Sequence, residues 1–210
     1  MLSTLAMIFM LSSLVETNTM SYLSYSIQDE SWISIAGSSN VNTFECYSNS
    51  NFTRGNIIVD ANASGNSIVF SEAKMALQIS SFDCKNPILN KDLYRALGAD
   101  RNPNILIELL DAQFKESQPQ NPNSGELKVS VAITINSKCK VIKVPIKWIR
   151  VSGSDIRFIG SHDINMTDFD ITPPSPAFGL IKVSEWISIN FNLSVKTNTP
   201  VFANDLAKVN

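Results

Sequence analysis

Apolar and polar residues alternate along much of this chain, and this pattern predicts β-strands with one buried face and one face in water. The clearest case is GELKVSVAITIN, residues 125–136, in which every second residue is apolar: Leu127, Val129, Val131, Ile133 and Ile135. Residues 184–195 repeat the pattern with Ile187, Ile189, Phe191, Leu193 and Val195. We expect both segments to be half-buried antiparallel strands.

Less regular alternation predicts further strands. In residues 154–165 the inward positions are expected to be Ile156, Phe158, His162 and Ile164. In residues 73–80 they are Ala73, Met75, Leu77 and Ile79. In residues 104–110 they are Ile105, Ile107 and Leu109. Shorter candidates lie at residues 32–37, 43–47, 56–60 and 141–150. About eight to ten strands with short connections indicate an all-β barrel or sandwich. A barrel is favoured because its closure removes exposed strand edges.

Residues 82–105, FDCKNPILNKDLYRALGADRNPNI, interrupt the alternation with one helical pattern between two prolines. Asn90 is expected to cap a helix over residues 91–97, and Gly98 is expected to end it. A helix of about two turns is not stable alone in water. We therefore expect it to lie over one opening of the barrel as a lid, with its contacts through Leu93, Tyr94 and Leu97.

The composition excludes some classes of partner. Hydrophobic residues make up 44% of the chain and charged residues 17%, which is enough for a sizeable core. The formal net charge of −2 gives no reason to expect nucleic acid as a partner, because proteins that bind it show a concentrated basic footprint. No interior run reaches the ~20 apolar residues that a membrane-spanning helix requires.

The first residues, MLSTLAMIFMLSSLV, form the longest apolar run and have the length of a signal-peptide core. A positively charged start and a small-residue cleavage site are missing, and a buried helix or a misplaced start codon would explain those absences. We favour a leader at residues 1–20, a barrel domain at residues 21–196 and a C-terminal tail at residues 197–210. The expected location is periplasmic or secreted.

Three cysteines, Cys46, Cys84 and Cys139, lie 38 and 55 residues apart. These spacings exclude a local zinc knuckle or a CxxC redox motif. In an exported protein, the simple expectation is one disulfide and one free thiol. The spacing alone does not select the pair.

Four segments, in order, resemble the YceI-like family of lipid- or polyisoprenoid-binding proteins in its Bacteroidetes-type variant. NKDLYRALGADRNPNI resembles the helix motif MDKxxYxALKADKYPxI, and IAGSSNVNTFECYS resembles GxSNVNxFxC. GELKVSVAITINSKCKVIKVPIKW resembles the hairpin GxLTIxGxTKxVxLxV, and INMTDFDITPPSPAFGLIKVSEWISINFNLSV resembles MTDFGIxPPxxxxGxIKxGDxVxIxFxL. The resemblance covers about residues 32 to 195.

The resemblance implies a lipocalin-like antiparallel barrel of about eight strands with one short helix. It also implies export, an interior that holds a long apolar chain, no catalytic residues, and a disulfide between Cys46 and Cys84. Three positions depart from the motifs of the founding members. Met166 replaces an arginine, Asp170 replaces a glycine, and Glu30-Ser31 replaces His-Ser.

A ligand barrel needs inward side chains that leave part of its interior empty. The inward rows are Val, Ile and Leu with few large aromatics, which fits either a cavity or a filled core, and the resemblance favours the cavity. The residues expected to line it are Met75, Leu77, Ile105, Ile107, Val129, Val131, Ile133, Phe158, Ile187, Ile189 and Phe191.

Two other groups of residues have competing interpretations. Lys138, Lys140, Lys143 and Lys147 could attract a pyrophosphate or an anionic membrane surface, but a solvated face that protects an edge strand is the interpretation we favour. His162, the one histidine, could bind a metal with Asp163, Asp168 and Asp170. The aspartates are more simply turn formers, and we expect no metal site.

The sequence therefore predicts an exported, non-enzymatic protein that holds a polyisoprenoid or another lipid for sequestration or transport. No cofactor is expected. The competing hypothesis is a structural or surface-interaction barrel with a filled core and no ligand.

Overall fold

The computed structural model describes residues 20–48, 52, 54–60, 67–114, 123–175 and 177–198. Residues 1–19 of the expected leader and residues 199–210 of the expected tail lie outside this range. Within the described residues the chain forms a 12-stranded antiparallel sheet, one α-helix and two short 3-10 helices. No helix in these ranges is long and apolar enough to cross a membrane.

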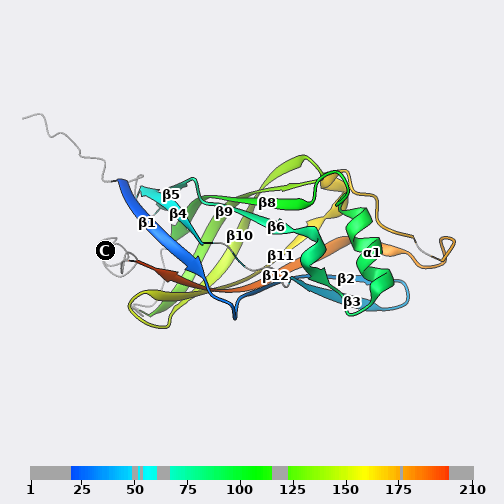
Figure 1. Ribbon diagram of the computed structural model, residues 1–210, viewed down its shortest axis with the longest axis horizontal. Coiled ribbons are helices and arrows are strands. Elements are labelled where there is room, and N and C mark those ends of the chain that lie inside the picture. Colours follow the sequence, from blue (N-terminus) through cyan, green and yellow to red (C-terminus); the bar gives the residue numbers. More distant parts are fainter. Residues whose placement is uncertain are drawn as a thin grey trace, which may run out of the picture.

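The elements follow one another as a meander with one helical interruption (Figure 1). The strands are β1 (Met20–Ile27), β2 (Trp32–Ser39), β3 (Thr43–Ser48), β4 (Arg54–Asp60), β5 (Ser67–Ser71), β6 (Lys74–Gln78), β7 (Phe82–Asp83), β8 (Asn104–Phe114), β9 (Ser124–Ile135), β10 (Lys138–Arg150), β11 (Asp155–Asn165) and β12 (Val183–Thr197). The helices are η1 (Ile79–Ser81), α1 (Pro87–Ala96) and η2 (Met166–Phe169).

Eight strands close into a ring. Antiparallel pairing runs β1-β4-β5-β8-β9-β10-β11-β12, and β12 pairs back to β1 through Tyr25↔Thr197 and Ile27↔Val195. The predicted antiparallel barrel of about eight strands is therefore confirmed. Figure 1 shows α1 near one end of the long axis, which we call the helix end, and the β10–β11 turn near the opposite end.

Two long strands change partner part of the way along the barrel. In its half nearer the helix end β12 pairs with β2, and the last pair of that stretch is Asn192↔Trp32. In its other half β12 pairs with β1. In the same way β8 pairs with β6 as far as Lys74↔Glu108, and then with β5 from Val69↔Asp111. The wall at the helix end is therefore completed by β6 and by β2-β3-β7, and the wall at the opposite end by β1-β4-β5 (Figure 1).

The β1-β4-β5 part of the wall and the part made by β6 and β2-β3-β7 meet along a line. Among the described residues no strand pairing crosses this line, because β4 pairs only with β1 and β5, and β6 pairs only with β8. This line, which we call the seam, runs from residues 28–31, between β1 and β2, to residues 72–73, between β5 and β6. Both of these corners are held to the ring. The Gln28 N–H donates to the Ser194 carbonyl (2.8 Å), and the Leu109 N–H donates to the Ala73 carbonyl (2.9 Å).

Each of the predicted strands is present, but three strands were not predicted: β1, β5 and the two-residue β7. β1 contains the alternating series Leu23, Tyr25 and Ile27, and β5 contains Ile68 and Phe70. β1 begins where the expected leader ends, and the apolar run of the leader masks the start of its alternation. β5 is only five residues long, too short for its alternation to stand out.

The helix begins earlier than predicted. Its N-cap is Asn86, not Asn90: the Asn86 side-chain oxygen accepts from the Ile88 N–H (3.0 Å) and the Leu89 N–H (3.2 Å). Pro87 occupies the first turn, where its missing N–H costs nothing. Asn90 lies inside α1, and its side-chain oxygen accepts from the Cys84 N–H (2.7 Å). Gly98 follows the helix with φ +71°, as expected for the residue that ends it.

The helix end of the barrel is filled by side chains that come largely from the connecting segments. We call this group the plug; it consists of Ile79, Phe82, Leu97, Met166, Phe169 and Ile171, all buried in one cluster. Met166 is part of it, so this departure from the family motif supplies core packing. The other departure, Asp170, adopts a left-handed conformation with φ 55°, a conformation that suits the glycine of the motif and that aspartate tolerates better than most residues.

Candidate ligand cavity

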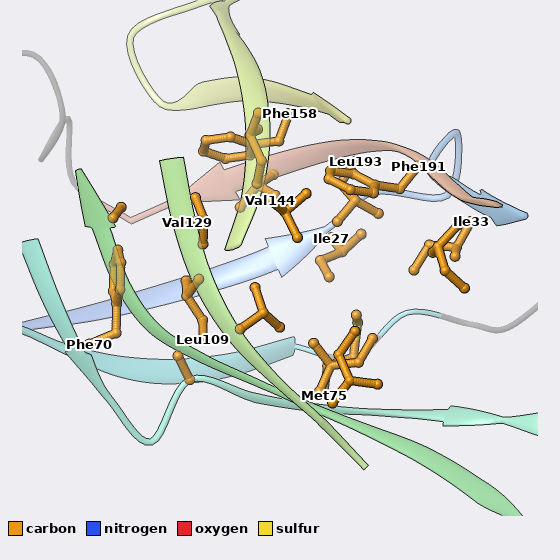
Figure 2. Close-up of a pocket in the computed structure, with 18 of the residues that line it drawn as sticks. Ile27, Ile33, Phe70, Met75, Leu109, Val129, Val144, Phe158, Phe191 and Leu193 are labelled. Atoms are coloured by element: carbon orange, nitrogen blue, oxygen red, sulfur yellow. The ribbon is translucent and has the colours of Figure 1, made fainter. Parts of the chain in front are cut away.

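A cavity of about 290 Å³ lies inside the barrel between the plug and the opposite end. It is formed by inward-facing side chains of the wall strands, several of which are shown in Figure 2. The volume is near the lower end of the ~300–1,000 Å³ typical of small-molecule sites. The barrel is thus filled at its ends and hollow in its middle, which favours the cavity over a wholly filled core.

The lining is almost entirely apolar. Its exceptions are Tyr25, Lys74, His162 and Thr197; all other lining side chains are Ile, Leu, Val, Phe, Met or Ala. An apolar lining of this kind offers no hydrogen bonds to replace those that water or a polar ligand would lose on entering. The interior therefore suits a hydrocarbon chain.

Of the residues that the sequence singled out for the lining, all except Ile187 line the cavity. These are Met75, Leu77, Ile105, Ile107, Val129, Val131, Ile133, Phe158, Ile189 and Phe191. Ile187 is 5% exposed and packs in the cluster that contains the plug. It shares the parity of Ile189 and pairs with Ile164, which does line the cavity. Whether the lining residues contact a ligand remains a prediction.

Val131 occupies the middle of the hollow region. It is partly buried and packs against both hydrophobic clusters, one at each end of the barrel. Among the described residues, no other partly buried hydrophobic side chain packs against both clusters. A larger side chain at this position would therefore extend into the space between them.

A glycine keeps part of the cavity open. Gly160 of β11 pairs with Phe191 of β12, and a Cβ at Gly160 would overlap the Phe191 ring. The ring therefore lies flat against the wall over Gly160. Any side chain at residue 160 would push the Phe191 ring toward the interior.

The titratable lining residues do not form a catalytic arrangement. Burial raises the pKa of the Tyr25 hydroxyl above 10.0, so that it stays neutral at physiological pH. The Lys74 ammonium lies 3.5 Å from the Glu108 carboxylate, and both side chains are substantially exposed. No hydrogen bond joins Tyr25, Lys74 or His162 to another of the three in the structure. Nor does any group of three or more His, Cys, Asp or Glu side chains in the described ranges form a potential metal site.

The predicted lid residues do not line the cavity. Leu97 is 1% exposed and belongs to the plug, while Leu93 and Tyr94 pack against the same cluster. The Tyr94 hydroxyl donates to the Phe82 carbonyl (2.7 Å), which ties α1 to β7. The helix thus covers the plug and not an open mouth, and movement of α1 as a flap remains a prediction.

Cys46 of β3 and Cys84, which precedes α1, form a disulfide, the pair that the family resemblance implied. Cys139 is a free and exposed thiol at the start of β10. The disulfide holds the segment between β7 and α1 to the neighbouring strand. It lies in the cluster that contains the plug, at the helix end.

The lysine-rich hairpin is exposed, as expected for a solvated face. Lys140, Lys143 and Lys147 are all exposed, and Lys138 forms an ion pair of 2.6 Å with Asp170. None of the four lines the cavity.

The sequence reasoning missed the lining residues of β1 and β5: Leu23, Tyr25 and Ile27 from β1, and Ile68 and Phe70 from β5. In β1 the signal was available, because serines alternate with these apolar residues in SYLSYSI. Tyr25 is the notable omission, since it brings a hydroxyl to an otherwise apolar wall.

Comparisons with known proteins place this arrangement in a family. The model of the YceI-like domain matches residues 29–195. The solved structure of BcnA from Burkholderia cenocepacia has 17% sequence identity and a TM-score of 0.57, covering 78% of this chain and 95% of that one. A polyisoprenoid binding domain from Saccharophagus degradans, implicated in plant cell wall breakdown, has 10% identity and a TM-score of 0.59, covering 82% and 97%. Both show a shared fold. No curated protein matches the chain.

Proposed function

Because the chain belongs to the YceI-like family, we propose that it is a lipid-binding protein that holds a long-chain amphiphile, a polyisoprenoid or another lipid, inside its barrel. The observation that carries this proposal is the apolar cavity between the two filled ends. The polyisoprenoid-binding domain with the same fold supports the ligand class. The protein acts by sequestration or transport and not by catalysis.

The energetics favour a chain-like ligand. Each CH₂ group moved from water into the cavity contributes about 0.8 kcal/mol, so affinity should rise with chain length until the cavity is full. The enclosing side chains offer little to a polar molecule, because only Tyr25, Lys74, His162 and Thr197 bring polar groups to the lining.

We also propose that the protein is exported, to the periplasm or beyond. The apolar run at residues 1–15 supports this. The disulfide between Cys46 and Cys84 supports it independently, because disulfides persist in oxidising compartments and are rare in the cytosol. Fractionation of cells that express the full chain should find it outside the cytoplasm with the disulfide formed.

Native mass spectrometry of protein purified without detergent tests lipid binding. We expect a co-purified lipid, or uptake of an added polyprenol, in the unmodified protein. Val131→Phe should fill the cavity and lower the affinity about tenfold, the equivalent of losing about two buried CH₂ groups. The control is Ala132→Phe, one residue along β9 on the opposite face, which should leave binding unchanged. An unmodified protein that neither carries nor takes up lipid would contradict the proposal.

A further inference from the structure

Both ends of the cavity are closed by packed side chains in the described part of the chain. At the helix end Ile79, Leu97 and Phe169 of the plug are each at most 1% exposed. At the opposite end Trp148 and Ile156 are 6% and 5% exposed. To admit a ligand, either end would have to separate residues that are packed at core density, which is costly because interiors have few voids.

The seam offers a different route. It crosses the wall at the middle of the barrel, where β8 and β12 change partners, and no strand pairing in the described residues spans it. Its two corners are held to β12 and β8 by the Gln28 and Leu109 N–H groups. Between these corners, widening the seam would break no strand pairing.

Lining residues lie on both sides of the seam. Ile27, at the end of β1, lies on one side, while Ile33 of β2 and Met75 of β6 lie on the other. Figure 2 shows these three toward one side of the cavity, and Phe70 and Val129 toward the other. Ile27 and Met75 are only partly buried, in contrast to the residues that close the two ends. The seam therefore leads directly into the hollow region.

One charged side chain is found at the same place. Lys74, the first residue of β6, is the only Lys, Arg, Asp or Glu among the described residues that line the cavity. Its side chain is 66% exposed, and its partner Glu108 is 41% exposed, so water reaches the ammonium group. A polar headgroup placed here would stay hydrated while its chain was buried.

From these observations we infer that an amphiphile enters the cavity sideways through the seam, and that its polar end stays at the seam beside Lys74 while its chain occupies the interior. This inference rests on the proposed lipid-binding function. It differs from a route through either end, because the plug and α1 then remain in place during binding.

The test blocks each route in turn. In a Cys139→Ser background, a single cysteine is introduced at the seam (Lys74→Cys), on α1 at the helix end (Arg95→Cys) or in the β10–β11 turn at the opposite end (Gly153→Cys). All three sites tolerate the change: the side chains of Lys74 and Arg95 are each 66% exposed, and a Cβ at Gly153 meets nothing within 4 Å. Each variant is labelled with polyethylene-glycol maleimide. Uptake of a fluorescent polyene fatty acid is then followed by stopped-flow fluorescence.

We expect the label at the Lys74→Cys site to slow uptake about tenfold relative to the same variant unlabelled, within the one to three decades that association rates span among variants of one site. Labels at the other two sites should leave the rate unchanged. Unchanged uptake in labelled Lys74→Cys, or slowing by a label at either end alone, would overturn the seam route while leaving lipid binding intact. Failure of the unlabelled Cys139→Ser protein to bind the probe would instead refute the proposed function, and the seam route with it.

Discussion

The plug and the hollow middle of the barrel are built from the same kinds of residues, yet one is packed and the other is empty. In the plug, Ile79 and Phe169 come from η1 and η2, and Leu97 directly follows α1, so that these connecting segments insert side chains into the end of the barrel. In the middle, Val131 and its neighbours all come from the wall strands. Eight strands enclose a space that their own side chains fill only in part, so the connecting segments decide which part is filled.

The same comparison shows where α1 is attached: it packs on the plug and not on the hollow region. Leu97, the residue directly after α1, fills space in the same way as a strand residue, and a disulfide and the Tyr94 hydrogen bond fix the segment in place. The residues that line the empty region lie in strands, apart from Ala73 between β5 and β6. Substitutions that distinguish the two regions should therefore differ in both stability and binding.

The largest difference is expected between two leucines. Leu97→Ala, in the plug, should lower the free energy of unfolding by about 3–5 kcal/mol, because it leaves a new cavity among packed side chains. Leu193→Ala, beside the existing cavity and partly exposed, should cost only about 1–2 kcal/mol, mainly the transfer term of the removed groups. Urea unfolding of both variants measures the difference; equal losses would show that the middle is as tightly packed as the plug.

Removal of the disulfide should weaken the helix end selectively. Cys46→Ala with Cys84→Ala should lower the free energy of unfolding by about 2–4 kcal/mol, because the unfolded chain regains the freedom of a 38-residue separation. Lipid affinity should stay the same, since neither cysteine lines the cavity. Denaturant titration and lipid binding on the same sample measure both effects. A large loss of affinity would mean that the plug and the cavity are mechanically coupled.

Gly160→Ala should act on the hollow region. The added methyl group displaces the Phe191 ring toward the interior, so lipid affinity should fall and stability should decrease by about 1–3 kcal/mol. Gly37→Ala is the matched control: its Cβ would approach the Phe44 ring to 2.5 Å, a similar clash in a pair whose residues do not line the cavity. It should reduce stability without reducing affinity, as measured by thermal unfolding and lipid titration. Equal affinities for the two variants would contradict the role assigned to Gly160.

The smallest effect is expected from Asp83, the last residue of β7. Its pKa is lowered from 3.8 to about 2, first by the hydrogen bond from the Lys85 ammonium and then by that from the Asn90 side chain. Because the folded-state pKa is the lower one, this carboxylate stabilises the fold above pH 3.8, and the contribution is lost as the pH falls toward 2. The side chain is 33% exposed, so the gain is small.

Asp83→Asn should therefore flatten the pH dependence of the melting temperature between pH 3.8 and about 2 and leave lipid affinity unchanged. Thermal unfolding across this range, with the unmodified protein as reference, provides the measurement. An unaltered pH dependence would mean that the Lys85 and Asn90 contacts are not maintained in solution.

The sequence predicted the wall of the barrel well because period-two alternation is a local signal. It identified β9, β11 and β12, and with them a large part of the lining, including Val131 and Phe158. It could not separate filled from hollow, because Ile187 and Ile189 have the same parity and differ only in which connecting segment approaches them. The helix start was misplaced for a similar reason. Asn86 and Asn90 are both good caps, and Pro87 at the first helical position was the signal that discriminates between them.

The seam had no local signal at all. It exists because β8 and β12 each pair with two successive strands along one edge, a property of the topology that neither strand's own residues encode. The same holds for Lys74, whose place at the edge of the cavity follows from where β6 begins.

The contact between β1 and β12 also sets the order in which the molecule can be assembled. Tyr25 pairs with Thr197. β1 therefore cannot pair with β12 until residues up to about 197 have been synthesised. Pairings this distant in sequence form slowly, and until they form β1 presents an unpaired edge to the surroundings. A nascent chain therefore remains an open, curved sheet up to the last stage of folding, and its inward apolar rows stay accessible until β1 and β12 meet.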